Sequence, residues 1–187
     1  MQVETFQLWK NTPGMCEEVP TITAYIPERG KKQGAVVILP GGGYCHRAPH
    51  EGMGYAEFLA VHGYSSFVVE YRVSPHEFPL PLLDARRGIR YVRYYAEKFG
   101  IDKNKVAIMG SSAGGHLAAL TSTYFDTIDY EGKDEIDKED FLPNAQILCY
   151  PVIDLHTSIA HEGSGMCLLG ARYDSDFEKF IPRLLAS

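Results

Sequence analysis

The stretch Val106-Ala107-Ile108-Met109-Gly110-Ser111-Ser112-Ala113-Gly114-Gly115-His116-Leu117 decides the fold of this chain. A short apolar run stops at Gly-Ser-Ser-Ala-Gly and continues as a helical pattern of small residues, which predicts a tight turn from a strand into a helix. The turn holds Ser112 in a strained backbone conformation, and Gly110 and Gly114 flank it because side chains there would collide across the turn. The first amides of the helix stabilise negative charge that develops beside the serine. The pattern therefore predicts Ser112 as a nucleophile.

A glycine-rich turn between a strand and a helix also binds phosphate in other proteins, and this is the alternative interpretation of the same stretch. The chain lacks the lysine of a P-loop and the G-x-G-x-x-G spacing of a dinucleotide site there. A strand before the serine and a helix after it are the context that a nucleophile elbow requires. The catalytic interpretation is therefore favoured.

A second glycine-rich stretch, Pro40-Gly41-Gly42-Gly43-Tyr44, follows the apolar run at residues 35–39. Such a run is typical of a strand buried on both faces of a parallel sheet. Consecutive glycines let backbone N–H groups approach a ligand closely, and an acyl-transfer enzyme needs two or three such donors around the oxygen of its tetrahedral intermediate. We therefore predict Gly42, Gly43 and Ala113 as oxyanion-hole residues. The alternative is a merely flexible turn.

Strand-like and helix-like segments alternate along the rest of the chain. Strands are predicted at residues 3–9, 19–26, 35–39, 65–71, 105–109 and 145–150, and helices at 52–62, 82–99 and 113–124. Residues 152–187 hold no further strand-like run, and a helix that begins near Ser175 is interrupted by Pro182. This order predicts an α/β fold with a mostly parallel sheet, in a single domain over residues 1–187.

Two charged segments are predicted to face solvent. Four arginines lie largely off the apolar stripe of the helix at 82–99, and a run of aspartates and glutamates occupies residues 126–140. The formal net charge of −6 argues against nucleic acid as a partner. The acidic run lacks the EF-hand spacing of a calcium loop, and neither a metal nor another cofactor is predicted. The four arginines of the helix predicted at 82–99 are Arg86, Arg87, Arg90 and Arg93.

The cysteines show no metal-ligand spacing and are interpreted as free thiols in a reducing compartment. They are Cys16, Cys45, Cys149 and Cys167. Residues 1–10 have neither the basic nor the apolar region of a signal peptide, and no apolar run approaches the length needed to span a bilayer. We therefore expect a cytoplasmic protein with no membrane partner.

Together, the two glycine-rich stretches resemble the α/β-hydrolase fold, and more narrowly the bacterial esterase/lipase group that includes acetyl-xylan and other carbohydrate acyl esterases. The likeness runs from about residue 20 to 170. Further matching stretches are Glu51-Gly52, Tyr71-Arg72-Val73, Pro81-Leu82-Leu83-Asp84-Ala85, Tyr150-Pro151-Val152-Ile153 and Leu168-Leu169-Gly170. The resemblance implies Ser112 as acyl nucleophile, with helices on both faces of the sheet. It also implies that Tyr44, His46 and Glu51 line the mouth of the site, and that Arg72 and Asp84 form a structural ion pair behind it.

The same resemblance implies a catalytic acid after a seventh strand and a histidine after an eighth. Only six strands are predicted, so we expect the N-terminal two-thirds of the usual fold, with the acid and the histidine beyond residue 187. His116 is expected to be structural. A displaced triad of Asp154 with His156 or His161 is the alternative. Missing strands would leave a sheet edge unpaired, which favours association.

We therefore expect a serine carboxylic-ester hydrolase that removes acetyl or other small acyl groups from a sugar or small alcohol through an acyl-enzyme on Ser112. The substrate is then a small-molecule or oligosaccharide ester. Within enzymes, a lipase or a peptidase is the alternative. The alternative from another class is a non-catalytic α/β fragment that binds small molecules, or that forms a homo-oligomer through its open sheet edge.

Overall fold

One six-stranded sheet organises the computed structural model, which describes residues 1–14, 17–28 and 33–176. The strand order is β1-β2-β4-β3-β5-β6; β1, β2 and β4 pair antiparallel, whereas β4, β3, β5 and β6 pair parallel. All six predicted strands are confirmed. They are β1 (Gln2–Gln7), β2 (Thr21–Ile26), β3 (Gln33–Leu39), β4 (Ser65–Glu70), β5 (Ile101–Ser111) and β6 (Ala145–Cys149).

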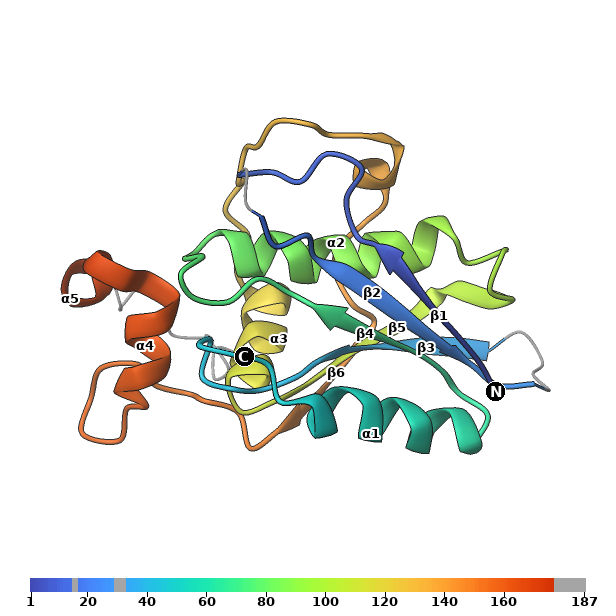
Figure 1. Cartoon of the computed structure of the whole chain (residues 1–187), viewed down its shortest axis with the longest axis horizontal. Coiled ribbons are helices and arrows are strands. Elements are labelled where there is room, and N and C mark those ends of the chain that lie inside the picture. Colours follow the sequence, from blue (N-terminus) through green and yellow to red (C-terminus); the bar gives the residue numbers. More distant parts are fainter. Residues whose placement is uncertain (15–16, 29–32, 177–187) are drawn as a thin grey trace.

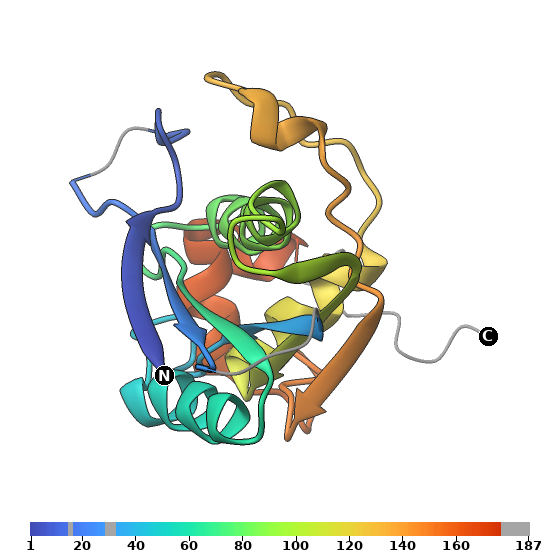
Figure 2. The ribbon, with the colours of Figure 1, turned by 90° about the vertical axis from the view of Figure 1, so that its right-hand side faces the viewer.

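Helices cover both faces of this sheet, as predicted for an α/β fold: α1 lies on one face and α2 and α3 on the other (Figures 1 and 2). The helices α4 and α5 lie beyond one end of the sheet, at the left of Figure 1. No helix of the described residues is long and apolar enough to cross a membrane. The helices are α1 (Pro49–Val61), α2 (Leu80–Tyr94), α3 (Ala113–Thr123), α4 (Glu162–Leu169) and α5 (Tyr173–Asp176), with 3-10 turns η1 (Glu135–Lys138) and η2 (Gly170–Arg172).

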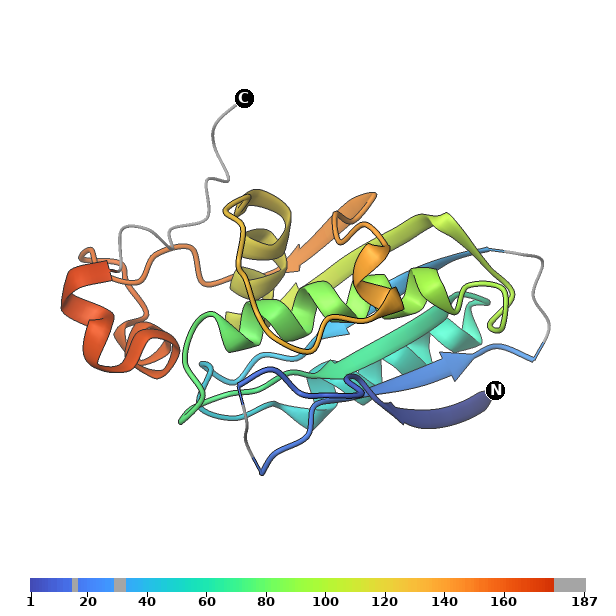
Figure 3. The ribbon, with the colours of Figure 1, turned by 90° about the horizontal axis from the view of Figure 1, so that it is seen from above.

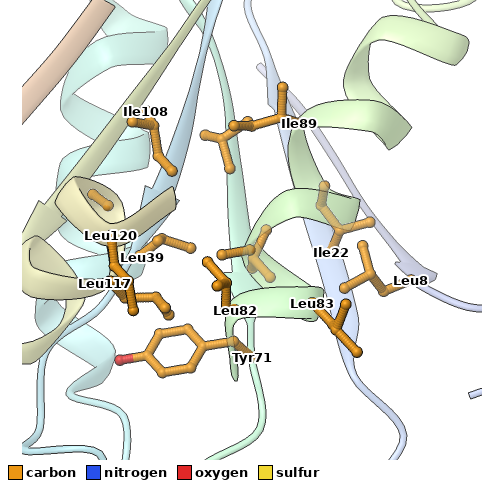
Figure 4. Close-up of a cluster of buried hydrophobic side chains, with 14 of the residues drawn as sticks. Leu8, Ile22, Leu39, Tyr71, Leu82, Leu83, Ile89, Ile108, Leu117 and Leu120 are labelled. Atoms are coloured by element: carbon orange, nitrogen blue, oxygen red, sulfur yellow. The ribbon is translucent and has the colours of Figure 1, made fainter. Parts of the chain in front are cut away.

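The strand β3 separates two hydrophobic cores. Its side chains alternate, so that Val36 and Ile38 pack on the α1 side while Val37 and Leu39 pack on the α2 and α3 side. Figure 4 shows the larger core, with Leu39 among residues of α2 and α3. Because both faces are covered, β3 is buried from Ala35 to Leu39, as its continuous apolar run predicts.

Two helix predictions need correction. The helix α2 ends at Tyr94, whereas its apolar stripe predicted helix as far as residue 99; residues 95–100 form turns. The helix α4 was not predicted, because two glycines lie within its eight residues and weaken the helical signal. The helix predicted near Ser175 begins at Tyr173, and residues 177–187, with Pro182, lie outside the described residues.

The prediction that the arginine side of α2 faces solvent is wrong. Arg86, Arg87 and Arg93 are buried because residues 126–142 run over α2 (gold to orange in Figure 3). Arg87 donates to both carboxylate oxygens of Asp134, each at 2.7 Å, and Arg93 donates to two backbone carbonyls of the same segment. The basic helix and the acidic segment therefore neutralise each other within the fold.

Candidate active site

Ser112 stands between the end of β5 and the start of α3, with φ 51° and ψ −120°. This conformation is rare for a residue with a side chain, and it is held by backbone hydrogen bonds. The Ser112 N–H donates to the carbonyl of Cys149 at 3.0 Å, and its own carbonyl accepts from His116 and Val152, each at 3.0 Å. The predicted strand–turn–helix geometry at Ser112 is therefore present, with a half-buried side chain.

The glycines around Ser112 are required by close backbone contacts. A Cβ atom on Gly110 would lie 2.7 Å from the backbone nitrogen of Gly115, and one on Gly114 would lie 2.5 Å from the carbonyl oxygen of Pro40. Both distances are shorter than real Cβ contacts allow. Side chains at these positions would therefore push α3 away from β5 and from the end of β3.

The glycine loop that follows β3 lies directly against the serine. A Cβ atom on Gly41 would lie 2.7 Å from the Ser111 carbonyl oxygen and 3.1 Å from Ser112 Cβ. Gly42 and Gly43 have φ values of 128° and 66°, which glycine adopts most easily. The two stretches that the sequence singled out, residues 40–44 and 110–114, thus form one site although they lie about 70 residues apart in the chain.

The hydrogen bonds of this loop leave specific amides available. The carbonyl of Gly41 accepts from Ala48 at 2.8 Å, and that of Gly42 accepts from Cys45 at 3.1 Å and from His46 at 3.2 Å. Within the described part of the chain, the N–H groups of Gly42, Gly43 and Ala113 donate no hydrogen bond. These are the three amides predicted to hold an oxyanion.

Tyr44 lies in the core rather than at the mouth of the site, which corrects the prediction for this residue. Its side chain is 0% exposed, and its hydroxyl lies 2.7 Å from His116 Nδ1. His116 is also fully buried, in agreement with its predicted structural role. The two aromatic rings meet edge to face, so the pair packs the base of the glycine loop against α3.

His46 and Glu51, the other residues predicted at the mouth, differ in exposure. His46 is exposed just after the glycine loop. Glu51 is buried, and its carboxylate accepts hydrogen bonds from the Gly41 N–H at 2.7 Å and from the Tyr150 hydroxyl. Both carboxylate oxygens of Glu51 are thus committed to protein donors, which does not fit a direct substrate contact.

The displaced triad is not assembled. The Asp154 carboxylate accepts from the Thr157 hydroxyl and from the N–H groups of Thr157 and His156, and these bonds lower its pKa. His161 caps α4, and its Nδ1 accepts from the Ser164 N–H at 3.2 Å. Among the residues that the structure describes, no hydrogen bond joins Ser112 Oγ to a histidine.

A disulfide joins Cys45, just after the glycine loop, to Cys167 of α4. The prediction that all cysteines are free thiols is therefore wrong for this pair; Cys149 is unpaired, and Cys16 lies outside the described residues. The pairing was not foreseen because the two cysteines are 122 residues apart and only the fold brings them together.

The start of α4 forms a wall of the site that the sequence did not reveal. A Cβ atom on Gly43 would lie 3.7 Å from Ser164 Oγ and 3.9 Å from His161 Cε1. His161 Nδ1 and Ser164 Oγ lie 2.8 Å apart, which holds this end of the helix together. The sequence analysis considered His161 only as a member of a displaced triad, whereas in the structure it is the N-cap of α4.

The predicted ion pair behind the site is confirmed. Arg72 Nε lies 2.8 Å from Asp84 Oδ2, and both side chains are 0% exposed. Trp9 Nε1 donates to the other oxygen of Asp84 at 2.7 Å. The pair joins the segment after β4 to α2 and to the N-terminal segment, so its role is structural.

Comparison with protein families decides where this chain belongs. A family model described as BD-FAE matches residues 22–179, which is most of the chain. The chain belongs to the BD-FAE family. This match covers the glycine loop, the elbow and α4, the three segments that form the candidate site.

Known proteins with related sequences and structures are esterases and related hydrolases. An acetylxylan esterase from Xylanibacter ruminicola is 35% identical over 150 residues, covering 80% of this chain and 28% of that protein. The acetyl ester-xyloside bifunctional hydrolase from Caldicellulosiruptor lactoaceticus has a TM-score of 0.81 at 43% identity, covering 89% of this chain and 63% of that chain. This BD-FAE chain thus spans less than two-thirds of either relative.

An alpha/beta hydrolase enzyme from a deep-sea metagenome library has a TM-score of 0.67 at 31% identity, covering 86% of this chain and 61% of that one. The similarity and the sheet order confirm the predicted α/β-hydrolase fold. The predicted resemblance to the esterase/lipase group with acetyl-xylan esterases is confirmed as well.

Proposed function

We propose that this BD-FAE protein is a serine carboxylic-ester hydrolase that removes acetyl or other small acyl groups from a sugar or small alcohol. The observation that carries the proposal is Ser112 at a strained elbow, against a glycine loop with unbonded amides. The acetyl ester-xyloside hydrolase, at 43% identity, supports an acetylated sugar as substrate.

In the proposed reaction, Ser112 Oγ attacks the ester carbonyl carbon and forms a tetrahedral intermediate, while the carbonyl π pair moves to the oxygen. The amides of Gly42, Gly43 and Ala113 stabilise this oxyanion, and one such donor is worth about 3–4 kcal/mol in other enzymes. Collapse of the intermediate breaks the bond to the alcohol oxygen, which leaves with the proton that a general base has taken from the Ser112 hydroxyl. Water then hydrolyses the acyl-serine.

Ser112 needs a general base, because a serine hydroxyl is a weak nucleophile at its own pKa. Among the described residues no histidine hydrogen-bonds to it. We therefore propose that the histidine and its acid come from a segment of a longer protein that packs beside Ser112, beyond residue 187. Without them, only the modest rate enhancement of oxyanion stabilisation and binding is expected.

Three further predictions about this protein stay proposals. Residues 1–187 are expected to belong to one domain, since one sheet connects the described segments. A homo-oligomer through β6 belongs to the non-catalytic alternative, in which no further strand pairs with this edge, and the 43% exposure of Ile147 on β6 is the observation that supports it. The expected cytoplasmic location rested in part on free cysteine thiols, and the Cys45–Cys167 disulfide removes that support. Cell fractionation tests the location.

The test of the catalytic proposal is intact mass spectrometry after exposure to a fluorophosphonate. The variants are Ser112→Ala and, as a matched control, Ser111→Ala, whose hydroxyl is buried one residue earlier in β5. We expect one adduct on the wild type and on the Ser111→Ala variant, and none on the Ser112→Ala variant. The same comparison on any longer gene product that contains these residues locates the base.

Labelling only in the longer product places the histidine outside residues 1–187, as proposed. Labelling of the isolated 187-residue chain contradicts that placement, because a general base must then lie within that chain. If neither form is labelled, the esterase proposal is wrong, and the non-catalytic α/β protein takes its place.

A further inference from the structure

Glu51 is a buried carboxylate whose partners are unusual for a charged side chain. It lies in the first turn of α1 with 11% of its side chain exposed, and the basic side chain that the described residues place within 4 Å is that of His50, with Nε2 at 3.8 Å and 81% of the side chain exposed. A buried charge is costly unless hydrogen bonds replace its water. For Glu51, these bonds come from the Gly41 N–H at 2.7 Å and the Tyr150 hydroxyl.

The bond to Gly41 fixes the first peptide of the glycine loop from both sides. The N–H of the Pro40–Gly41 peptide donates to Glu51, and its carbonyl accepts from the Tyr71 hydroxyl at 2.5 Å. Because a peptide unit is planar, these two bonds set its orientation. The next two carbonyls, of Gly41 and Gly42, are also bonded, so the N–H groups of Gly42 and Gly43 point away from those bonds with no partner of their own among the described residues.

The second bond connects the same carboxylate to the segment after β6. Tyr150 has φ 35° and follows Cys149, whose carbonyl accepts from the Ser112 N–H at 3.0 Å. The hydrogen bond to Glu51 raises the pKa of Tyr150 to about 12, so its hydroxyl stays a donor at neutral pH. Glu51 therefore bridges the two loops that flank Ser112.

We propose that Glu51 is a positioning residue that holds the glycine loop in the geometry in which the Gly42 and Gly43 amides can receive an oxyanion beside Ser112. The hydrogen bond from Tyr150 to Glu51 fixes the position of the glycine loop relative to the elbow. This inference rests on the proposed function for its catalytic meaning, while the bridge itself can be measured without any activity.

The experiment is amide exchange by NMR on protein labelled with ¹⁵N-glycine. Glu51→Gln removes the charge and keeps the shape, and Glu57→Gln is the matched control, because it removes the same charge from the exposed side of the same helix. Gly88, buried in α2, is the internal reference for global stability. We expect the Gly41 amide of the Glu51→Gln variant to exchange roughly tenfold faster than in the control, with shifted Gly42 and Gly43 signals and unchanged Gly88 exchange.

A Gly41 exchange rate within twofold of the control overturns the proposal. So does equal acceleration at Gly88, since that shows a general loss of stability. If Glu51→Gln does not fold, Tyr150→Phe carries the test, because it removes only the bridging hydroxyl from an exposed ring. We expect at least threefold faster Gly41 exchange in that variant, and an unchanged rate overturns the bridge.

Fluorophosphonate labelling separates this inference from the function on which it rests. With an active Ser112, the Glu51→Gln variant is expected to label about tenfold more slowly than Glu57→Gln. A wild type that takes no label contradicts the esterase proposal, while the exchange comparison still decides whether Glu51 positions the loop.

Discussion

Replacing Asp84 with Asn tests the buried ion pair that supports the site from behind. The Asp84 carboxylate accepts from the Arg72 backbone N–H at 2.9 Å, from Arg72 Nε and Nη2 at 2.8 Å each, and from Trp9 Nε1 at 2.7 Å. Asn has a similar shape but no charge, and its NH₂ group must face one of these donors. The Arg72 guanidinium then stays buried without its counter-charge.

The magnitude follows from the burial of both side chains, which are 0% exposed. Removing one partner of such a pair costs about 3–5 kcal/mol, because an uncompensated charge is left in the interior. The total unfolding free energy of a domain is about 5–15 kcal/mol. We therefore expect Asp84→Asn to lose a large share of the stability.

Urea unfolding measures this loss, followed by far-UV circular dichroism and by fluorescence of Trp9, the single tryptophan, which contacts Asp84 directly. With a slope of about 2 kcal/mol per molar urea, the midpoint falls by about 1.5–2.5 M. The control is Asp102→Asn, which removes the partner of Lys105, 3.7 Å away at the surface. Its loss should stay below about 1 kcal/mol.

If Asp84→Asn lowers the unfolding free energy by less than about 1 kcal/mol, as the control does, the reasoning is refuted. The double variant Arg72→Met/Asp84→Leu gives a second check. It should lose less than Asp84→Asn, because no charge then remains buried. A larger loss in the double variant would mean that packing, not charge, governs this region.

Four other predictions concern the elbow, α1, α4 and α2. Gly114→Ala should cost about 1–3 kcal/mol or more in urea unfolding, because its Cβ would lie 2.5 Å from a backbone carbonyl oxygen. Gly54→Ala, with open space around it in α1, should instead stabilise by about 0.5–1 kcal/mol. Unreduced peptide mass mapping should find Cys45 linked to Cys167; separate peptides would contradict the disulfide. An arginine hydrogen bond lowers the pKa of Asp134, so this stabilisation is present above the ordinary value of 3.8 and is lost as pH falls through the lower folded-state pKa. The melting temperature of Asp134→Asn should therefore lie below the wild type at pH 7 and approach it at about pH 3; an equal gap at both pH values would contradict the pairing.

The sequence by itself determined the parts of this protein that depend on neighbouring residues. An apolar run, a glycine and a helical pattern follow one another around Ser112, and local sterics then allow one geometry, which the structure has. The six strands were predicted for the same reason, because alternation and β-branched content act over a few residues. Gly42 and Gly43 were found because consecutive glycines after a buried strand are a local signal.

Only the tertiary structure decided what depends on contacts between distant segments. A tyrosine in a glycine loop and a glutamate at a helix start look exposed in sequence, yet Tyr44 is buried against His116, and Glu51 turns inward to hold Gly41 and Tyr150. The arginines of α2 look solvated in sequence, but Arg86, Arg87 and Arg93 are buried beneath the acidic segment, which supplies Asp134 to Arg87. Charge and polarity set the cost of burial, whereas the partner that offsets this cost is known only when the fold has brought the two segments together.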